Sequence, residues 1–274
     1  MDNGITSEEL ARRIRVHVIE MTHASHASHV ASALSVADIL AVLYGGVMRC
    51  DPRRPDLPER DRLVLSKGHA GSAIYAALAE RGFFPVEELR RYYTNGSPYS
   101  GHVSAAGVPG VEFSTGSLGH GVSVACGIAL ALRMKGSRAR VFAIVGDGEC
   151  DEGSVWETAR LASKLGLSNF TVIVDRNRMQ AMGRTPEGVS LAERWRAFGF
   201  DTRECDGHDH EALRCALAPA QEGSERPVCV VARTVKGRGV SFMEDDLLWH
   251  YRDPQGEWYE RAMSELGGKL GGEV

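Results

Sequence analysis

Short apolar runs that end in polar residues alternate with helix-like patterns along this chain. Apolar, β-branched runs at residues 141–145 and 170–174 predict two buried strands, and a helix-like pattern at about residues 151–165 lies between them. Gly146-Asp147-Gly148 ends the first run, and Asp175-Arg176-Asn177 ends the second. This unit predicts an α/β fold, with a mostly parallel sheet flanked by helices and polar side chains where the strands end.

The same alternation continues on both sides of this unit. Further short apolar runs predict strands at residues 61–65, 200–205 and 228–235. Helices are predicted at residues 6–21, 71–81, 122–134, 187–198 and 210–221. Thr6 stands three residues before Glu9, which is the arrangement of a capping box, so the first helix is expected to begin there.

The polar breaks after the two central strands carry candidate metal ligands. Asp147 offers a carboxylate and Asn177 a neutral oxygen, which suit Mg²⁺ or Ca²⁺ better than zinc. Gly146 and Gly148 allow the backbone to approach a bulky anion, and the N-terminus of the following helix offers free N–H groups to a phosphate. These features indicate a metal-diphosphate site. Gly-Asp-Gly by itself is also compatible with a tight turn in a doubly wound domain.

Composition excludes several classes of protein. The 274 residues carry a net charge of −4 with no basic stripe, which argues against nucleic-acid binding. No apolar stretch reaches membrane-spanning length, and residues 1–10 are too polar for a signal peptide, so no membrane association is expected. The six cysteines are scattered without a CxxC pair, which disfavours zinc and predicts reduced thiols and a cytoplasmic location.

Three histidines recur at three-residue spacing near the N-terminus. They are His23, His26 and His29. Such a tract could bind a metal, but neither a carboxylate nor a thiol accompanies it. A role outside metal binding is therefore favoured.

The spacing of the central motif carries a family resemblance. Gly-Asp-Gly is followed by 28 residues and then by Asn177, which is similar to the thiamine-diphosphate signature of the transketolases. The resemblance implies thiamine diphosphate with Mg²⁺ as cofactors, Ca²⁺ or Mn²⁺ being possible substitutes. It implies metal ligation by Asp147, Asn177 and the backbone of Met179. The chain would form a single thiamine-diphosphate-binding domain over residues 1–274, with an N-terminal helical arm and a Gly-rich tail at 267–274.

Histidines in separate loops extend this resemblance. Ser-Lys-Gly-His ending at His69 is similar to a transketolase segment, although His69 could instead cap the helix after it. His29 takes the place of another family histidine, but Ser28 and Val30 replace common Gly and Pro neighbours. The resemblance implies catalytic roles for these two histidines, for His102 and His250, and for Glu152, which would link two cofactor sites across a subunit interface.

Glycine-rich segments supply the implied cofactor contacts. Residues 114–121 are similar to a family segment that faces the cofactor, with His120 where many relatives have Gln. Lys236 lies in a Lys-Gly-Arg-Gly loop that is similar to a family loop that closes over the cofactor. The Lys236 side chain is expected either to face an anion or to be merely solvated. The implied cofactor-binding residues are Gly116, Ser117, Leu118, Gly146, Asp147, Gly148, Glu149, Asn177, Lys236 and His250.

The length of the chain suggests the N-terminal subunit of a split transketolase. The resemblance implies transfer of a two-carbon ketol unit from a ketose-type donor to an aldehyde or related acceptor. It implies a separate C-terminal subunit with the pyrimidine-binding domain, an α2β2 assembly, and sugar or sugar phosphate substrates. An α subunit of a 2-oxo acid dehydrogenase, passing an acyl or glycolyl unit to a carrier domain, remains an alternative. So do a 1-deoxyxylulose-phosphate synthase and a non-catalytic cofactor-binding regulatory subunit.

Overall fold

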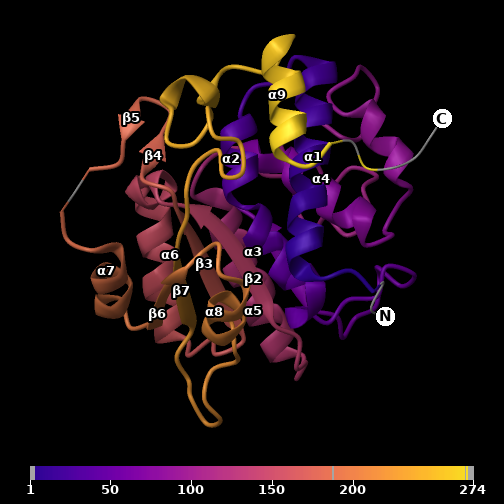
Figure 1. The fold of residues 1–274 in the computed structure, drawn as a ribbon. Helices are drawn as coiled ribbons and strands as arrows, with labels where there is room; N and C mark the ends of the chain where they lie inside the picture. Colours follow the sequence, from indigo (N-terminus) through magenta and orange to yellow (C-terminus); the bar gives the residue numbers. More distant parts are fainter. Residues whose placement is uncertain (1–3, 187, 269, 271–274) are drawn as a thin grey trace.

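A five-stranded parallel sheet forms the centre of the protein (Figure 1). The computed structural model describes residues 4–186, 188–268 and 270. Its strands lie in the order β1 (Arg62–Leu65), β2 (Val141–Gly146), β3 (Phe170–Arg176), β7 (Val228–Arg233) and β6 (Asp201–Asp206). Each neighbouring pair is parallel, from Arg62 opposite Val141 at one edge to Asp201 opposite Val228 at the other. The predicted α/β class is confirmed.

Alternating side chains of the strands point into two separate cores. Phe142 and Ile144 of β2 join one apolar cluster, while Val141, Ala143 and Val145 join the other. Because successive side chains of a strand point to opposite faces, both faces of this sheet are buried. Unbroken apolar runs such as residues 141–145 are therefore the sequence signature of these strands.

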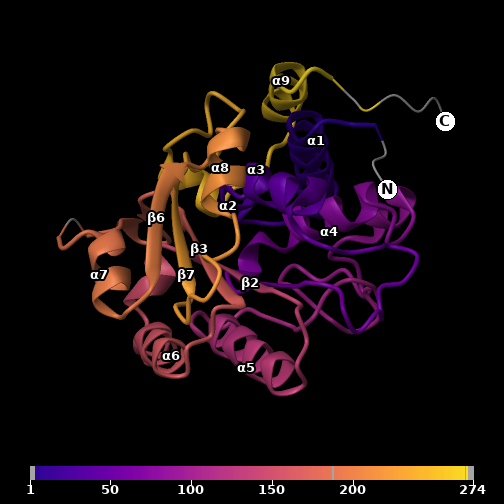
Figure 2. The ribbon, with the colours of Figure 1, turned by 90° about the horizontal axis from the view of Figure 1, so that it is seen from below.

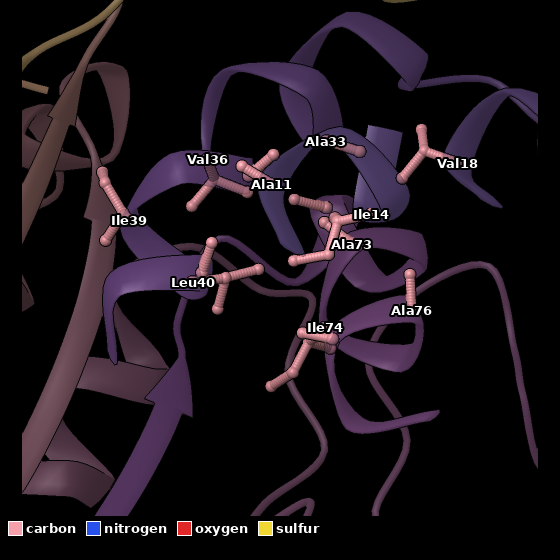
Figure 3. Packing of buried hydrophobic residues seen from close by; sticks show 14 of the residues in the cluster. Ala11, Ile14, Val18, Ala33, Val36, Ile39, Leu40, Ala73, Ile74 and Ala76 are labelled. Atoms are coloured by element: carbon pink, nitrogen blue, oxygen red, sulfur yellow. The ribbon is translucent and has the colours of Figure 1, made fainter. Parts of the chain in front are cut away.

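Helices cover both faces (Figure 2). On one face lie α5 (His120–Met134), α6 (Gly153–Lys164) and α7 (Leu191–Ala197). On the other lie α1 (Ser7–Ser25), α2 (Val30–Ser35), α3 (Ala37–Val42), α4 (Gly71–Glu80) and α8 (His210–Ala216), with α9 (Glu257–Glu265) against α1. Residues such as Ile14, Leu40 and Ile74 interlock α1, α3 and α4 (Figure 3). None of the helices among the described residues is long and apolar enough to cross a bilayer.

Most predicted elements are present, with differences at their ends. The helix predicted at 210–221 ends at Ala216, three residues before Pro219, which cannot continue a helix. The helix predicted at 187–198 begins at Leu191, and residue 187 lies outside the described part of the chain. The hairpin of β4 (Met179–Gln180) and β5 (Gly183–Arg184) was not predicted, nor was α9. Most of the expected Gly-rich tail also lies outside the described residues.

Short helices shape the loops around the sheet. They are η1 (Leu43–Val47), η2 (Gly68–Ala70), η3 (Val86–Arg91), η4 (Gly148–Asp151) and η5 (Leu247–His250). Three of them, η2, η4 and η5, carry residues predicted to form the site.

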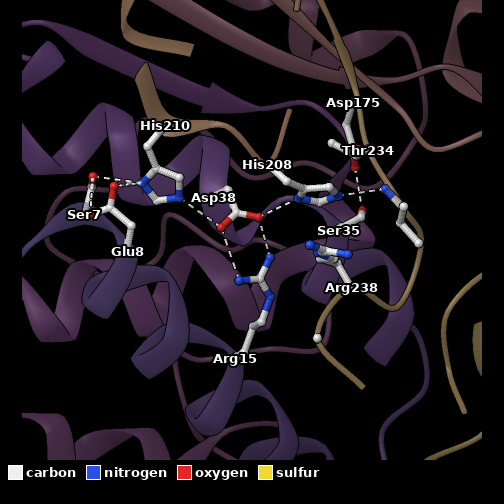
Figure 4. Close-up of polar contacts among 12 residues, drawn as sticks. Ser7, Glu8, Arg15, Ser35, Asp38, Asp175, His208, His210, Thr234 and Arg238 are labelled. Carbon is white, nitrogen blue, oxygen red and sulfur yellow. Dashed lines mark hydrogen bonds and ion pairs between the residues drawn. The ribbon is translucent and has the colours of Figure 1, made fainter. Parts of the chain in front are cut away.

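A buried polar network ties the N-terminal helices to the far edge of the sheet (Figure 4). Asp38 accepts hydrogen bonds from both terminal nitrogens of Arg15 and contacts His208 at 2.6 Å and His210 at 3.0 Å. Burial opposes ionisation of Asp38, but His208, His210 and Arg15 hold its pKa well below the usual range. The other ring nitrogen of His208 accepts from the backbone N–H of Val235 at 2.8 Å. This network therefore positions the loop that carries Lys236.

Candidate functional site

The polar residues that end β2 and β3 meet at the carboxyl edge of the sheet. Asp147 follows β2 and is buried, and its Oδ2 accepts the backbone N–H of Arg178 at 2.7 Å. Asn177 follows β3 and is also buried, and its Oδ1 accepts the backbone N–H of Met179 at 3.1 Å. The turn after β2 and the turn after β3 are therefore joined, and together they bring the three groups predicted to hold a metal to one place. Their assignment as ligands remains a prediction.

The surroundings of Asp147 disfavour the ionised form of its carboxyl group. Burial, together with the nearby Asp175 carboxylate, raises the pKa of Asp147 to about 6. A carboxylate with a raised pKa beside a second carboxylate is an environment that a divalent cation would stabilise. The carboxylate and amide oxygens also have the chemistry that Mg²⁺ prefers. The residues present thus fit the implied metal.

A buried ion pair beside this turn was not predicted. Lys67 and Asp175 are 1% and 0% exposed, and Lys67 Nζ lies 2.5 Å from Asp175 Oδ2. Ser35 donates to the same oxygen at 2.7 Å, and Thr234 donates to the other. Burial opposes its ionisation, yet Lys67 and these hydroxyls keep the pKa of Asp175 below its ordinary value. A lysine directly after a buried strand was the available signal in the sequence.

Glu149 connects three loops rather than facing an open cleft. Its Oε1 accepts from Ser66 Oγ at 2.5 Å and from the backbone N–H of Gly119 at 2.8 Å. Its Oε2 accepts from the backbone N–H of Gly146 at 3.2 Å. Burial raises the pKa of this carboxyl. In the structure the hydrogen bonds of Glu149 stabilise the Gly-Asp-Gly turn. Direct contact of Glu149 with a cofactor remains a prediction.

Four histidines from separate loops form a cluster at the same edge. The ring centroid of His29 lies 4.9 Å from that of His250, 5.3 Å from that of His69 and 5.7 Å from that of His102. The backbone N–H of His29 donates to the carbonyl of His250 at 2.9 Å, which joins two loops more than two hundred residues apart. All four predicted histidines are therefore brought together.

His69 does not cap the helix that follows it. The N-cap position of α4 is Ala70, and no side chain caps that end. His69 lies one residue before Ala70, in η2, with its ring 6.0 Å from that of His250. The alternative role as a helix cap is wrong.

His29 is held in an uncommon conformation. Its φ of 71° is in the left-handed region, which costs energy for a residue with a side chain. Its Nδ1 is buried and has no hydrogen-bond partner among the described residues. A buried ring nitrogen without a partner is costly, so it indicates a group that binds in this cluster. The implied cofactor or a substrate hydroxyl would satisfy it.

Lys236 brings positive charge to the histidine cluster. Its side chain is buried, and Nζ lies 2.8 Å from Nδ1 of His250. Since an ammonium group only donates, His250 accepts at Nδ1 and carries its proton on Nε2. Burial and the neighbouring Lys67 lower the pKa of Lys236 to about 8. Lys236 is therefore not a solvated side chain, which leaves the anion-facing alternative.

Burial and these ammonium groups favour the neutral form of three of the clustered imidazoles, those of His29, His69 and His250. Burial, His102 and Lys236 lower the pKa of His29 to about 4. Burial and Lys236 lower the pKa of His250 to about 3, and burial and Lys67 lower that of His69 well below its usual value. Lys236, beside these neutral imidazoles, provides a positive charge that suits a diphosphate anion, whereas the charge of Lys67 is paired with Asp175.

The lowered pKa values predict loss of stability in acid. Between about pH 6.5 and pH 4 the unfolded chain binds protons at these histidines and the folded chain does not, so stability falls as pH falls. Each histidine contributes at most about 1.4 kcal/mol per pH unit in that window. We expect His250→Gln to reduce the slope of the free energy of unfolding against pH, measured by urea unfolding at several pH values. His26→Gln, at an exposed histidine paired with Asp253, should leave the slope unchanged. An equal reduction in both variants would show that the buried cluster is not the cause.

The remaining predicted residues lie around this cluster. Gly116 lies beside His102, and a Cβ at this position would make an ordinary contact with its ring at 3.4 Å. Leu118 is half-buried and Ser117 exposed in the loop before α5, and exposed His120 is the first residue of that helix. Glu152 is exposed at the N-cap of α6, away from the histidines, where a contact with another subunit would be open to it. His23 and His26 contact Pro254 and Asp253, so the three N-terminal histidines do not face one another.

Comparison with known proteins yields one consistent family. Residues 6–250 match the family described as "Transketolase, thiamine diphosphate binding domain". The chain is 38% identical to 6-deoxy-6-sulfo-D-fructose transketolase subunit SqwG from Clostridium sp. (strain MSTE9), covering 97% of this chain and 98% of that protein. It is also 38% identical to an apulose-4-phosphate transketolase subunit from Actinobacillus succinogenes, covering 94% of this chain and 95% of that protein.

Solved structures agree on the fold. A transketolase variant from Pichia stipitis superimposes with a TM-score of 0.90 at 26% identity, and the transketolase from Leishmania mexicana with 0.89 at 29%. The alignments cover 96% of this chain but only 41% and 42% of those proteins.

Proposed function

Because this chain belongs to the transketolase family, we propose that it is the diphosphate-binding subunit of a two-chain transketolase. The family makes it a thiamine-diphosphate-dependent transferase, and relatives of matching length are named as subunits, which implies a partner subunit. These matches do not favour the alternatives of a 2-oxo acid dehydrogenase subunit or a regulatory subunit. The observation that carries the proposal is the histidine cluster beside the Asp147–Asn177 turn at one sheet edge.

The residues would divide the binding of the cofactor between them. When bound, thiamine diphosphate supplies carbanion chemistry that no side chain offers. Asp147, Asn177 and the Met179 carbonyl would hold Mg²⁺, and Lys236 would face the diphosphate. Bringing that anion to Lys236 would offset the charge that depresses the pKa of His250.

The histidines would act on protons and hydroxyl groups. His29, His69 and His250 are neutral near pH 7, so each can donate at one ring nitrogen and accept at the other. His102 is exposed at the rim of the cluster, where it can meet a substrate oxygen. We propose that these side chains position a sugar or sugar phosphate and move protons during transfer of a two-carbon ketol unit.

The assembly follows from the same proposal. The partner would carry the pyrimidine-binding domain, and two copies of each chain would form an α2β2 enzyme in which Glu152 links the cofactor sites. All six cysteines are unpaired thiols, and four of them are buried. This supports a cytoplasmic location.

Metal-dependent cofactor binding provides the test of this function. Asp147→Ala removes a charged ligand, so we expect affinity for thiamine diphosphate with Mg²⁺ to fall by at least about tenfold. Calorimetric titration of the full chain, with and without Mg²⁺, measures this. Asp151→Ala, at an exposed carboxylate on the same turn, is the matched control and should bind as the parent does. Unchanged affinity in a folded Asp147→Ala chain would remove the proposed metal site.

A further inference from the structure

Asp147 also forms part of the wall of a polar pocket. This pocket has a volume of about 430 Å³, and its walls include Arg176, Arg178, Arg184 and Arg194. None of the clustered histidines lines it, nor do Lys236 and Asn177. It is therefore separate from the histidine cluster, although both share the Asp147 turn.

The four arginines converge from different elements. Arg176 ends β3, Arg184 ends β5, and Arg194 lies in α7. Arg178 lies in the turn between Asn177 and Met179 with φ of 62°, so its position requires a strained backbone. Hydrogen bonds fix this turn, because the backbone N–H of Thr185 donates to the carbonyl of Arg178 at 3.0 Å. The hairpin thus holds two guanidinium groups at one wall.

These arginines have no ion-pair partner in the described part of the chain. Among the described residues, the carboxylates in the pocket wall are Asp147 and Asp151. Asp147 is already occupied, since its oxygens accept from Gly148, Arg178 and Thr185. By contrast, Arg196 on the same helix α7 pairs with Glu204 at 3.2 Å. Of these two arginines of α7, the unpaired Arg194 lines the pocket and the paired Arg196 does not.

Crowding of like charges costs energy unless an anion offsets it. Among the described residues of the wall, four guanidinium groups stand against two carboxylates, one of which is the proposed metal ligand Asp147, so this wall is positively charged and suits a phosphate anion. The planar guanidinium donates in a fork that fits phosphate oxygens. The hydroxyl of Ser190 and the backbone of Gly188 lie in the same wall and can add contacts.

We propose that this pocket binds a small molecule carrying a phosphate group, at a site distinct from that of thiamine diphosphate. Its volume falls within the range of small-molecule sites, of about 300–1,000 Å³, and exceeds what bare phosphate fills. The phosphate can belong to a phosphorylated metabolite or be free. The proposal does not depend on transketolase activity.

Calorimetric titration of the full chain tests it. Inorganic phosphate and glycerol 3-phosphate serve as probes, with and without saturating thiamine diphosphate and Mg²⁺. We expect Arg184→Gln combined with Arg194→Gln to weaken binding of at least one probe by at least about tenfold. Arg184→Lys, which keeps the charge but loses the fork, should weaken it less. Arg196→Gln is the matched control on α7 and should not weaken it. If glycerol 3-phosphate binds more tightly than inorganic phosphate, the ligand is a phosphorylated metabolite. If the two probes bind equally, the ligand is free phosphate.

Three results would overturn the proposal. The first is that neither probe binds the parent chain. The second is that Arg196→Gln weakens binding as much as the double variant does, which would indicate general charge attraction. The third is that the double variant weakens binding of thiamine diphosphate as much as it weakens binding of the probes, which would place these arginines in the cofactor site. Loss of cofactor binding in Asp147→Ala alone bears on the proposed function and not on this pocket.

Discussion

Supplied with a partner that carries the pyrimidine-binding domain, this chain is expected to transfer a ketol unit, whereas alone it is expected to show no turnover. Related chains of the same length are named as subunits, and the larger part of the solved transketolases lies beyond the span that this chain matches. The histidine cluster supplies groups for proton transfer, but polarisation of the cofactor's aminopyrimidine would come from the partner. The expected change is from no activity to full activity.

An enzyme-coupled assay of the aldose product, with a ketose donor and an aldehyde acceptor, measures this. Each chain alone, with thiamine diphosphate and Mg²⁺, is the control. Size measurement of the mixture should show a heteromer with equal numbers of both chains. Turnover of a ketose by the purified single chain would contradict the requirement for a partner.

The reconstituted enzyme should lose most of its activity when His69 or His250 is replaced by alanine. Their rings lie 6.0 Å apart and both contact the His29 ring, so both belong to the cluster that is proposed to act on the substrate. Removal of one proton donor or acceptor costs about 10²–10⁴-fold in rate. The effect should appear mainly in kcat, and the melting temperature should stay within a few degrees of the parent.

The matched control is His26→Ala, at an exposed histidine whose ring contacts the half-buried carboxylate of Asp253. It should retain near-parent activity. If His250→Ala unfolds and the cofactor does not rescue it, the contact between Lys236 and His250 is structural rather than functional. A folded His69→Ala chain with near-full turnover would remove His69 from the site.

Local patterns were sufficient for the strands and for the Gly-Asp-Gly turn. Residues 141–145 and 170–174 are apolar at almost every position because both faces of the parallel sheet are buried, and that composition is visible without a structure. The turn residues follow directly after those strands, so their meeting at one edge follows from parallel pairing. Element ends were less predictable: the helix predicted at residues 210–221 ends at Ala216, before Pro219, and the helix predicted at 187–198 begins at Leu191.

The sequence by itself determined the fold class, the candidate metal ligands and the identity of the four histidines. Only the tertiary structure decided which charges neutralise one another. Lys67 meets Asp175 across more than one hundred residues, and Asp38 meets His208 and His210 across a still longer gap. The four pocket arginines, in contrast, found no ion-pair partner within the described chain. Hydrophobic periodicity is a property of neighbouring residues, whereas ion pairing depends on distances that chain folding alone sets.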